Sequence, residues 1–507
     1  MCCHDMSRRT FVIGTGAAVA AGMAASKAAA QTGEPWPAGY WDSERPYQRD
    51  NRPLRVLPVL MYRTPTPREA RSWKSWGGVQ TPEAAAEEVN RISGELAALQ
   101  EEADFPVEVL PVVKVKEESE TARVRKQEAD LVILYPAAGS GQMLRDCVQG
   151  RDAIVFVRHR SGPVYYWYEA LSTRYLEKTD APPHEGATAP LSVHDVVVDD
   201  TAELLWRMRA VRAVRNTRGT RVLALGGPWG KYAAEAPEVA REKYGLEVID
   251  LPYDDIAPRL AAMLEDEARL RLARQWTDAY LNLPGTTLDT KREFVVNGFL
   301  LYGLFKDLMR EHHAGAFTIK DCMSIILPMA KTTACLTLGL LNDEGLLSFC
   351  ESDFVIIPAG ILLHHIARKP VFLHNSTFPH KGVVTCAHCS SPRRFNGGRY
   401  EPTRVMTHYE SEYGAAPKVD IPVGQKVTFI DPEYATGRWV GMTGSVEDNP
   451  LLDICRSQQD VRIDGDWRKL LDEVRDSHWV MCYGGYLREA GYAARKLGVD
   501  WQDISTV

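Results

Sequence analysis

Hydrophobic and polar positions follow two periods in turn along the first half of the chain. Short, almost wholly apolar runs of strand length surround a longer segment in which apolar residues recur every three or four positions. Because this alternation is typical of parallel β-α-β units, we expect a doubly wound α/β domain over residues 53–215. The segments concerned are LRVLPVLMY, PEAAAEEVNRISGELAALQEEAD, VEVLPVVKV, ADLVILYPA and DAIVFVRH.

The alternation resumes downstream and then changes character. TRVLALGGPWGKYAAEAPEVAREKYGLEVIDL has the pattern of strand, Gly-rich turn, helix and strand, and it predicts a second doubly wound domain over residues 216–378. The turn GGPWGK lacks the spacing of a phosphate loop, so we expect a tight turn that brings the backbone close to a ligand or a neighbouring loop. From residue 379 onward, short β-like runs alternate with Gly, Pro and Asp turns, which predicts a β-rich C-terminal domain over 379–507.

The first thirty residues differ from the rest of the chain. Arg8 and Arg9 precede a mild apolar run rich in Gly and Ala, which ends in AAAQ at residues 28–31. This pattern resembles a twin-arginine export signal, and the run is too short for a permanent membrane anchor. We therefore expect an export signal over 1–30, a linker over 31–52, and a periplasmic or otherwise exported mature protein without a membrane anchor.

The net charge of the chain bears on whether it binds nucleic acid. With 507 residues, of which 45% are hydrophobic and 25% charged, the chain can bury a large core in several domains. Its formal net charge of -7 supplies no electrostatic attraction to a polyanion. We therefore expect no nucleic-acid partner.

The stretch TCAHCSSPRR, residues 385–394, permits three interpretations. Cys386 and Cys389 form a C-x-x-C that could bind zinc or exchange disulfides, and His388 between them could ligate another metal. A four-cysteine zinc site needs a second close cysteine pair, which the sequence lacks. A redox C-x-x-C usually opens a helix, whereas Ser-Ser-Pro follows here. We expect the two cysteines to pack as small apolar side chains and His388 to be the functional residue.

Four predicted strand ends carry groups that can bind metals. Ligands of open α/β sheets bind at such ends, and a carboxylate with several imidazoles suits manganese, cobalt, iron or zinc. The structural alternative is that each histidine, taken singly, is a satisfied residue of the core. The groups are Glu351 and Asp353 in CESD, His374 and Asn375 in FLHN, His388 in TCAHC, and His478 in SHWV.

From about residue 290 to the end, the succession of motifs resembles the L-fucose and L-arabinose isomerase superfamily. The resemblance implies a metal-dependent aldose-ketose isomerase, an intramolecular oxidoreductase that moves a proton between C1 and C2 of an open-chain sugar through an ene-diol. It also implies manganese as the metal, with cobalt, iron or zinc as alternatives, and a homo-oligomer, a trimer or hexamer. The motifs are the CESD to FLHNSTF segment, VVTCAHCSSPRR, THYESEYGAAPKVDIPVGQKVTFI, CRSQQD and HWVMCYGG.

The resemblance assigns roles to individual residues. Glu351 matches a metal-ligating and catalytic carboxylate, His388 matches a metal histidine, and His478 falls where the family has a histidine pair, with Trp479 in place of the second member. Where the family has its second acidic ligand, this chain has His374 followed by Asn375. The expected metal ligands are Glu351, His374, His388 and His478, the expected catalytic acids Glu351 and Asp353, and the expected substrate-binding residues Asn375 and Arg456.

A second functional class stays open at this point. A chain that keeps an isomerase scaffold but has lost turnover would be a non-catalytic, exported carbohydrate-binding protein. Convergence of Glu351, His374, His388 and His478 favours the enzyme, whereas a His374 or His478 directed into a core favours the binding protein.

Overall fold

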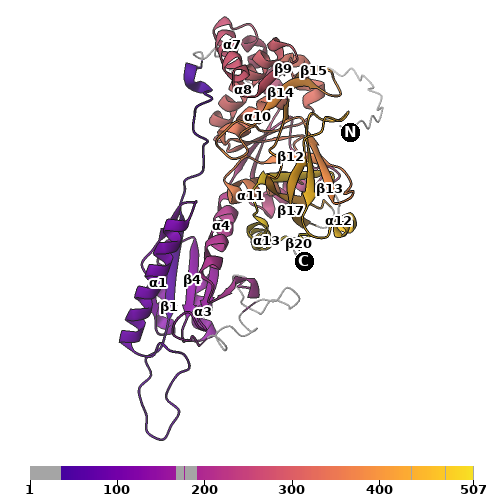
Figure 1. Cartoon of the computed structure of the whole chain (residues 1–507). Helices are drawn as coiled ribbons and strands as arrows, with labels where there is room; N and C mark the ends of the chain where they lie inside the picture. Colours follow the sequence, from indigo (N-terminus) through magenta and orange to yellow (C-terminus); the bar gives the residue numbers. More distant parts are fainter. Residues whose placement is uncertain (1–35, 167–175, 177–190, 435–436, 474–475, 506–507) are drawn as a thin grey trace, which may run out of the picture. The chain divides into compact units, whose positions relative to one another are not determined.

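The structure is a computed structural model that describes residues 36–166, 176, 191–434, 437–473 and 476–505 (Figure 1). The predicted export signal over 1–30 lies outside these residues. The described chain is a mixed α/β protein with two parallel sheets and a β-rich C-terminal region, as the sequence predicted.

The first parallel sheet has the strand β1 (Leu54–Met61) in its interior, with β2 and β3 on one side and β4 on the other. All but one of the β1 residues are buried, which matches the continuous apolar run of its sequence. Helix α1 (Pro82–Glu102) begins where the Thr81 hydroxyl accepts a hydrogen bond from the backbone N–H of Ala84, with proline in the first turn. The other elements of this region are β2 (Val107–Val109), β3 (Val113–Val115), η2 (Glu118–Glu120), α2 (Thr121–Arg125), β4 (Leu131–Pro136), α3 (Gly141–Val148), β5 (Asp152–Val157), η3 (Val193–Asp195), β6 (Val196–Val198) and α4 (Thr201–Thr217).

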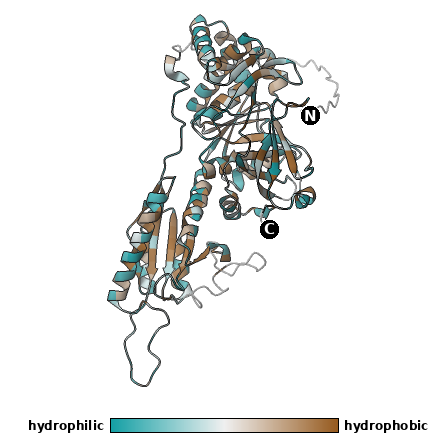
Figure 2. Cartoon of the chain, in the orientation of Figure 1, coloured by the Kyte–Doolittle hydropathy of each residue, from teal (hydrophilic) through white to brown (hydrophobic). Residues whose placement is uncertain are grey.

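The second parallel sheet has the order β11-β10-β7-β8. The strands β7, β10 and β11 are mostly apolar and buried, whereas only the last residue of β8 is buried. Helix α8 packs an aromatic and aliphatic face against α7 and α10. Figure 2 shows hydrophobic residues along the strands and hydrophilic ones on the outer helices such as α1. The elements are β7 (Arg221–Leu225), α5 (Ala236–Glu242), β8 (Glu247–Leu251), α6 (Tyr253–Met263), α7 (Glu267–Leu281), α8 (Arg292–Glu311), β10 (Ala316–Ile319), η4 (Cys322–Ile326), α9 (Leu327–Ala330), α10 (Cys335–Glu344), β11 (Leu347–Cys350) and α11 (Ile357–Ala367).

The C-terminal region is built on an antiparallel sheet that closes on itself. Its strands follow the order β16-β19-β12-β13-β18-β17, and a further pairing of β16 with β17 completes the ring, which we call the closed sheet. A smaller sheet has the strand order β15-β14-β9. The short helix η1 lies near the start of the described chain. The bounds are η1 (Ala38–Tyr40), β9 (Thr286–Asp289), β12 (Phe372–Ser376), β13 (Val383–His388), β14 (Thr403–His408), β15 (Tyr413–Val419), β16 (Lys426–Pro432), β17 (Arg438–Asp448), β18 (Ser457–Ile463), α12 (Trp467–Glu473), β19 (His478–Tyr483), α13 (Leu487–Lys496) and β20 (Asp500–Asp503).

Helix length and hydropathy bear on membrane insertion. In the part of the chain that the structure describes, no single helix is both long and apolar enough to cross a bilayer. The segments Cys322–Ala330 and Cys335–Glu344 reach that length and composition only as a pair with a 91° bend between them.

Candidate functional site

The site begins where β11 ends. Glu351 and Ser352, the next two residues, have φ values of 65° and 50°, in the left-handed region that non-glycine side chains disfavour. Each such residue costs on the order of 1 kcal/mol, and strain of this kind gathers at functional sites. After this turn, Asp353 forms an isolated parallel bridge with Trp229 in the loop after β7. The turn thus brings Glu351 and Asp353 to the carboxyl edge of the second parallel sheet.

His478, the first residue of β19, lies between two carboxylates. Its Nδ1 is 2.7 Å from Oδ2 of Asp353, and its Nε2 is 3.3 Å from Oε2 of Glu351. Burial lowers the pKa of His478, but the hydrogen bonds and charges of Asp353 and Glu351 outweigh it and raise the pKa to about 9. In this arrangement the imidazole is therefore a cation at neutral pH.

His388, the last residue of β13, approaches the same carboxylate from another strand. Its Nε2 lies 3.7 Å from Oε1 of Glu351. On the other side of the ring, Nδ1 is 2.9 Å from the Ser390 hydroxyl and accepts a hydrogen bond from the Ser390 N–H. Ser390 thus fixes the ring with Nε2 toward Glu351.

Glu351 is the negatively charged group at the middle of this arrangement. Burial raises the pKa of Glu351, but the hydrogen bonds and charges of His388 and His478 lower it by more. The pKa of Glu351 is therefore well below its usual range. Its side chain is 21% exposed, whereas His478 and Asp353 are fully buried. Glu351 is therefore an ionised carboxylate with part of its side chain at the surface.

Lys231 also belongs to the site, and the sequence analysis did not single it out. Its backbone N–H donates to Oδ1 of Asp353 at 3.0 Å, and its Nζ lies 3.4 Å from Nε2 of His478. The side chain is buried. The sequence did hold a signal for Lys231. It is the last residue of the GGPWGK turn, which was expected to bring the backbone close to a ligand or a neighbouring loop. We call Glu351, Asp353, His388, His478 and Lys231 the Glu351 centre.

His374 lies apart from this centre. It is fully buried inside the closed sheet, where its ring lies 5.6 Å from those of Phe372 and Phe429 and 6.3 Å from that of Trp479. Nδ1 is 3.2 Å from the Ser376 hydroxyl, and Nε2 has no hydrogen-bond partner among the described residues. Burial lowers its pKa to about 3, so the ring is neutral. This position does not support the expected role of His374 as a metal ligand.

The two expected substrate-binding residues are placed differently. Asn375 pairs in register with His478 on the neighbouring strand, so the two residues lie side by side. The Arg456 guanidinium donates to the Thr407 carbonyl at 2.7 Å and lies over the Tyr409 ring, 5.2 Å from its centroid. Asn375 is thus next to the Glu351 centre, whereas the contacts of Arg456 hold it against the end of β14 and Tyr409, which follows that strand.

The cysteines around His388 are free thiols. Cys386 is fully buried in the core of the closed sheet, and Cys389 packs in a small apolar cluster with Cys335 and Cys455. The described cysteines form no disulfide. The expectation that Cys386 and Cys389 pack as small buried side chains is confirmed.

The donor atoms of the centre fit a divalent metal in kind. Both imidazoles present Nε2 to Glu351. Nδ1 of His478 contacts Asp353, the kind of outer partner that orients metal-binding histidines, whereas Nδ1 of His388 accepts from the Ser390 N–H, so a neutral His388 ring carries its proton on Nε2. Among the residues that the structure describes, however, no three His, Cys, Asp or Glu side chains stand so that they could hold a metal ion. The donor types fit a metal, but both Nε2 atoms carry protons in this arrangement, and the spacing of the donors does not enclose an ion.

Comparison with known proteins does not assign the chain to a family. No protein-family model matches the chain, and no curated protein matches it significantly. The function is therefore argued from the geometry of the Glu351 centre.

We predict that His374→Leu leaves metal content unchanged and makes the protein less sensitive to acid. With its pKa near 3 in the fold and near 6.5 when unfolded, His374 takes up a proton on unfolding, so its contribution to stability is lost as the pH falls below 6.5. At pH 5 this loss is about 2 kcal/mol. Chemical denaturation at pH 7.5 and pH 5 should show a smaller difference for the variant than for wild type.

The matched control for this prediction is His380→Leu, at an exposed histidine of the loop between β12 and β13. It should follow the wild-type pH dependence. If wild type and His374→Leu lose the same stability between pH 7.5 and pH 5, His374 is not buried in a neutral state. If His374→Leu loses bound metal that wild type holds, His374 is a metal ligand after all.

Proposed function

We propose that the chain is a metal-dependent aldose-ketose isomerase-like enzyme, acting on a sugar or sugar derivative through an ene-diol in the manner of the L-fucose and L-arabinose isomerase superfamily. The observation that carries the proposal is the ionised, partly open Glu351 carboxylate between Nε2 of His388 and Nε2 of His478. The proposal includes two doubly wound parallel-sheet domains before the β-rich domain, assembly as a trimer or hexamer, and export by a twin-arginine-like signal.

Glu351 is suited to move the proton. An ionised carboxylate at this position can accept the proton from C2 of an open-chain aldose. The C2–H electron pair then forms the C1–C2 double bond of the ene-diol, and the carbonyl electron pair moves to O1, which takes up a proton. Return of the proton from the carboxyl group to C1, with loss of the O2 proton as the C2 carbonyl forms, gives the ketose. The low pKa of Glu351 keeps the carboxylate in the form that accepts a proton at neutral pH.

The positive groups of the centre stabilise negative charge. The Lys231 ammonium lies 3.4 Å from Nε2 of His478 and places a cation at the Glu351 centre. A divalent metal, if held by Glu351, His388 and His478, would take the place of the Nε2 protons of the two rings and would polarise two adjacent sugar oxygens. Manganese is our first choice, with cobalt, iron and zinc as alternatives.

Asp353 acts through His478 rather than on substrate. Its carboxylate is fully buried and accepts hydrogen bonds from the backbone N–H groups of Lys231 and Val355, at 3.0 and 3.1 Å, besides its contact with His478. Asp353 was expected to be a second catalytic acid. We infer instead that it is a positioning residue that fixes the orientation and charge of His478.

Metal content tests the proposal. Wild type, Glu351→Gln, His388→Ala and the control His380→Ala would each be incubated with manganese, cobalt, iron(II) or zinc, desalted, and measured by elemental mass spectrometry. We expect about one ion per chain in wild type and in His380→Ala, and none in the two site variants, because each loses one of the three donors. Wild type that binds none of the four ions would overturn the metal-dependent mechanism.

The second candidate function is a non-catalytic, exported carbohydrate-binding protein. Two observations favour it, namely the position of His374 in the core of the closed sheet and the lack of a three-ligand group in the described part of the chain. This candidate predicts that sugars bind to wild type without metal and without conversion to ketose. Calorimetric titration with aldoses, followed by product analysis, separates it from the isomerase.

A further inference from the structure

A hollow lies far along the chain from the Glu351 centre and shares no residue with it. It has a volume of about 640 Å³ and is lined by residues that follow β1, by residues that follow β3, and by the helix α3. Ligand pockets in proteins commonly measure about 300–1,000 Å³. The hollow is therefore large enough for a small metabolite.

The strand order marks this hollow as a ligand site independently of its size. From β1 the chain proceeds to β2 and β3 on one side of it, and then to β4 on the other side. Where the direction of strand order reverses, the loops at the carboxyl ends of the strands diverge and leave a crevice in which ligands of open α/β sheets bind. Arg63 and Thr64 follow the end of β1, and Lys116 follows the end of β3, so the hollow is at that point.

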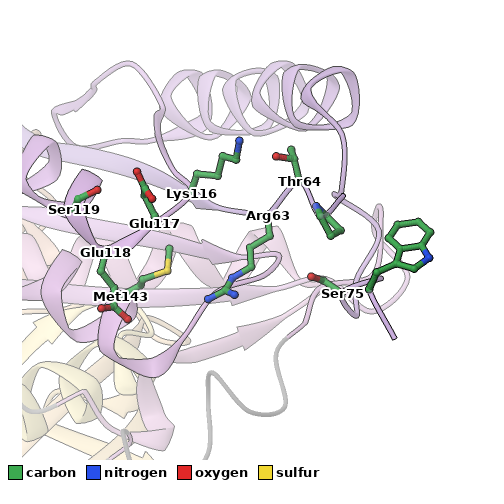
Figure 3. A pocket seen from close by; sticks show the side chains of 10 residues that line it. Arg63, Thr64, Ser75, Lys116, Glu117, Glu118, Ser119 and Met143 are labelled. Carbon is green, nitrogen blue, oxygen red and sulfur yellow. The ribbon is translucent and has the colours of Figure 1, made fainter. Parts of the chain in front are cut away.

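Two cations, Arg63 and Lys116, and two acids, Glu117 and Glu118, line the hollow. Figure 3 shows Arg63 and Lys116 projecting from neighbouring segments, with Thr64 and Ser75 beside them. Within the described part of the chain, neither the Arg63 guanidinium nor the Lys116 ammonium forms a hydrogen bond or an ion pair. Of the two acids, Glu118 accepts a hydrogen bond from the Ser140 hydroxyl at 3.0 Å, and within the described residues neither acid forms an ion pair with Arg63 or Lys116. Both cations are therefore available to a bound anion.

The segment between β1 and α1 supplies the excess of positive charge around the hollow. Besides Arg63, residues 62–80 carry Arg68, Arg71 and Lys74 against the single acid Glu69. A connection of this length without regular structure is uncommon in a compact domain and is often a binding loop. The loop therefore raises the local concentration of anions around the hollow.

The remaining lining suits a ligand with hydroxyl groups. Thr64, Ser75 and Ser119 supply hydroxyls that donate and accept hydrogen bonds. Trp73, whose side chain is 37% exposed, and the buried Met143 supply apolar surface for the C–H groups of a small ring. We propose that this hollow is a binding site for a hydroxylated small anion, a sugar acid or a sugar phosphate.

Isothermal titration calorimetry on the full chain tests the site. The ligands are D-gluconate for the carboxylate, D-glucose 6-phosphate for the phosphate, and neutral D-glucose. We expect at least one anion to bind and to lose at least about tenfold in affinity in the double variant Arg63→Gln, Lys116→Gln, because a charge-assisted hydrogen bond contributes about 1.5–3 kcal/mol. D-glucose should bind more weakly than that anion. Which anion binds identifies the charged group that the site accepts.

Two controls make the outcome decisive. The double variant Arg68→Gln, Lys74→Gln removes the same charge from loop residues outside the lining and should keep the wild-type affinity within about threefold. Glu351→Gln should leave binding unchanged, since it alters only the Glu351 centre, so failure of the proposed function and failure of this site are distinguishable. The proposal is overturned if neither anion binds wild type, or if both double variants weaken binding equally.

Discussion

Glu351→Gln is expected to lower kcat for ketose formation by at least about 10²–10⁴-fold, the usual contribution of a positioned acid-base group, because it also removes a metal donor. The amide keeps the shape of the side chain but removes the charge that lies 3.3 Å from His478 and 3.7 Å from His388. It also removes the proton acceptor, because an amide is not a base at neutral pH. The assay measures ketose formed from a panel of aldoses after loading with each candidate metal.

Glu447→Gln is the matched control for this experiment. Glu447 is a half-exposed residue of β17 that pairs with Arg462, so the same chemical change at this position should leave turnover as in wild type. Thermal unfolding followed by circular dichroism would establish that both variants fold. Full turnover in Glu351→Gln would place the proton transfer on another residue and remove the basis of the proposed mechanism.

Asp353→Asn is expected to reduce kcat and metal affinity by about 10–100-fold, as for other second-layer partners of ligating histidines. Asparagine can still accept hydrogen bonds from the backbone N–H groups of Lys231 and Val355, so the turn after β11 should persist. It cannot supply the negative charge that holds His478 as a cation at 2.7 Å. Because Asp353 touches no open space, KM for the sugar should change little while kcat falls.

Asp199→Asn serves as the control for Asp353→Asn. Asp199 likewise accepts hydrogen bonds from backbone N–H groups, those of His159, Arg160 and Ser161, but in the loop after β5. This substitution should leave kcat unchanged. A rise in KM with unchanged kcat in Asp353→Asn would contradict a positioning role and indicate direct contact with substrate.

The sequence determined the layout of strands and the residues that end them. β1, β4 and β11 are continuous apolar runs because both faces of a parallel sheet are covered, and such runs are visible without a fold. The polar residues that stop these runs are equally visible. Glu351, His388 and His478 could therefore be selected as strand-end residues, and the structure brings their side chains together.

Only the tertiary structure decided which partners these residues meet. Lys231 is far from His478 in sequence, and no local pattern predicts that its ammonium reaches an imidazole 247 positions away. The thiol of Cys389 likewise packs with Cys335 and Cys455 rather than with Cys386, two residues before His388. Contacts of this kind depend on how separate sheets and loops pack, which local periodicity does not encode.

The contrast between His374 and Asn375 shows the physical reason most directly. Neighbouring residues of a strand point to opposite faces, so a shift of one residue in register exchanges which of them enters the core. The pairing of β12 with β19 sets Asn375 opposite His478 and His374 opposite Trp479. That register is fixed by the packing of the closed sheet, and it buries His374 among aromatic rings while Asn375 lies beside the Glu351 centre. The sequence specified that a histidine and an asparagine end this strand, and long-range strand pairing specified which of them lies beside the site.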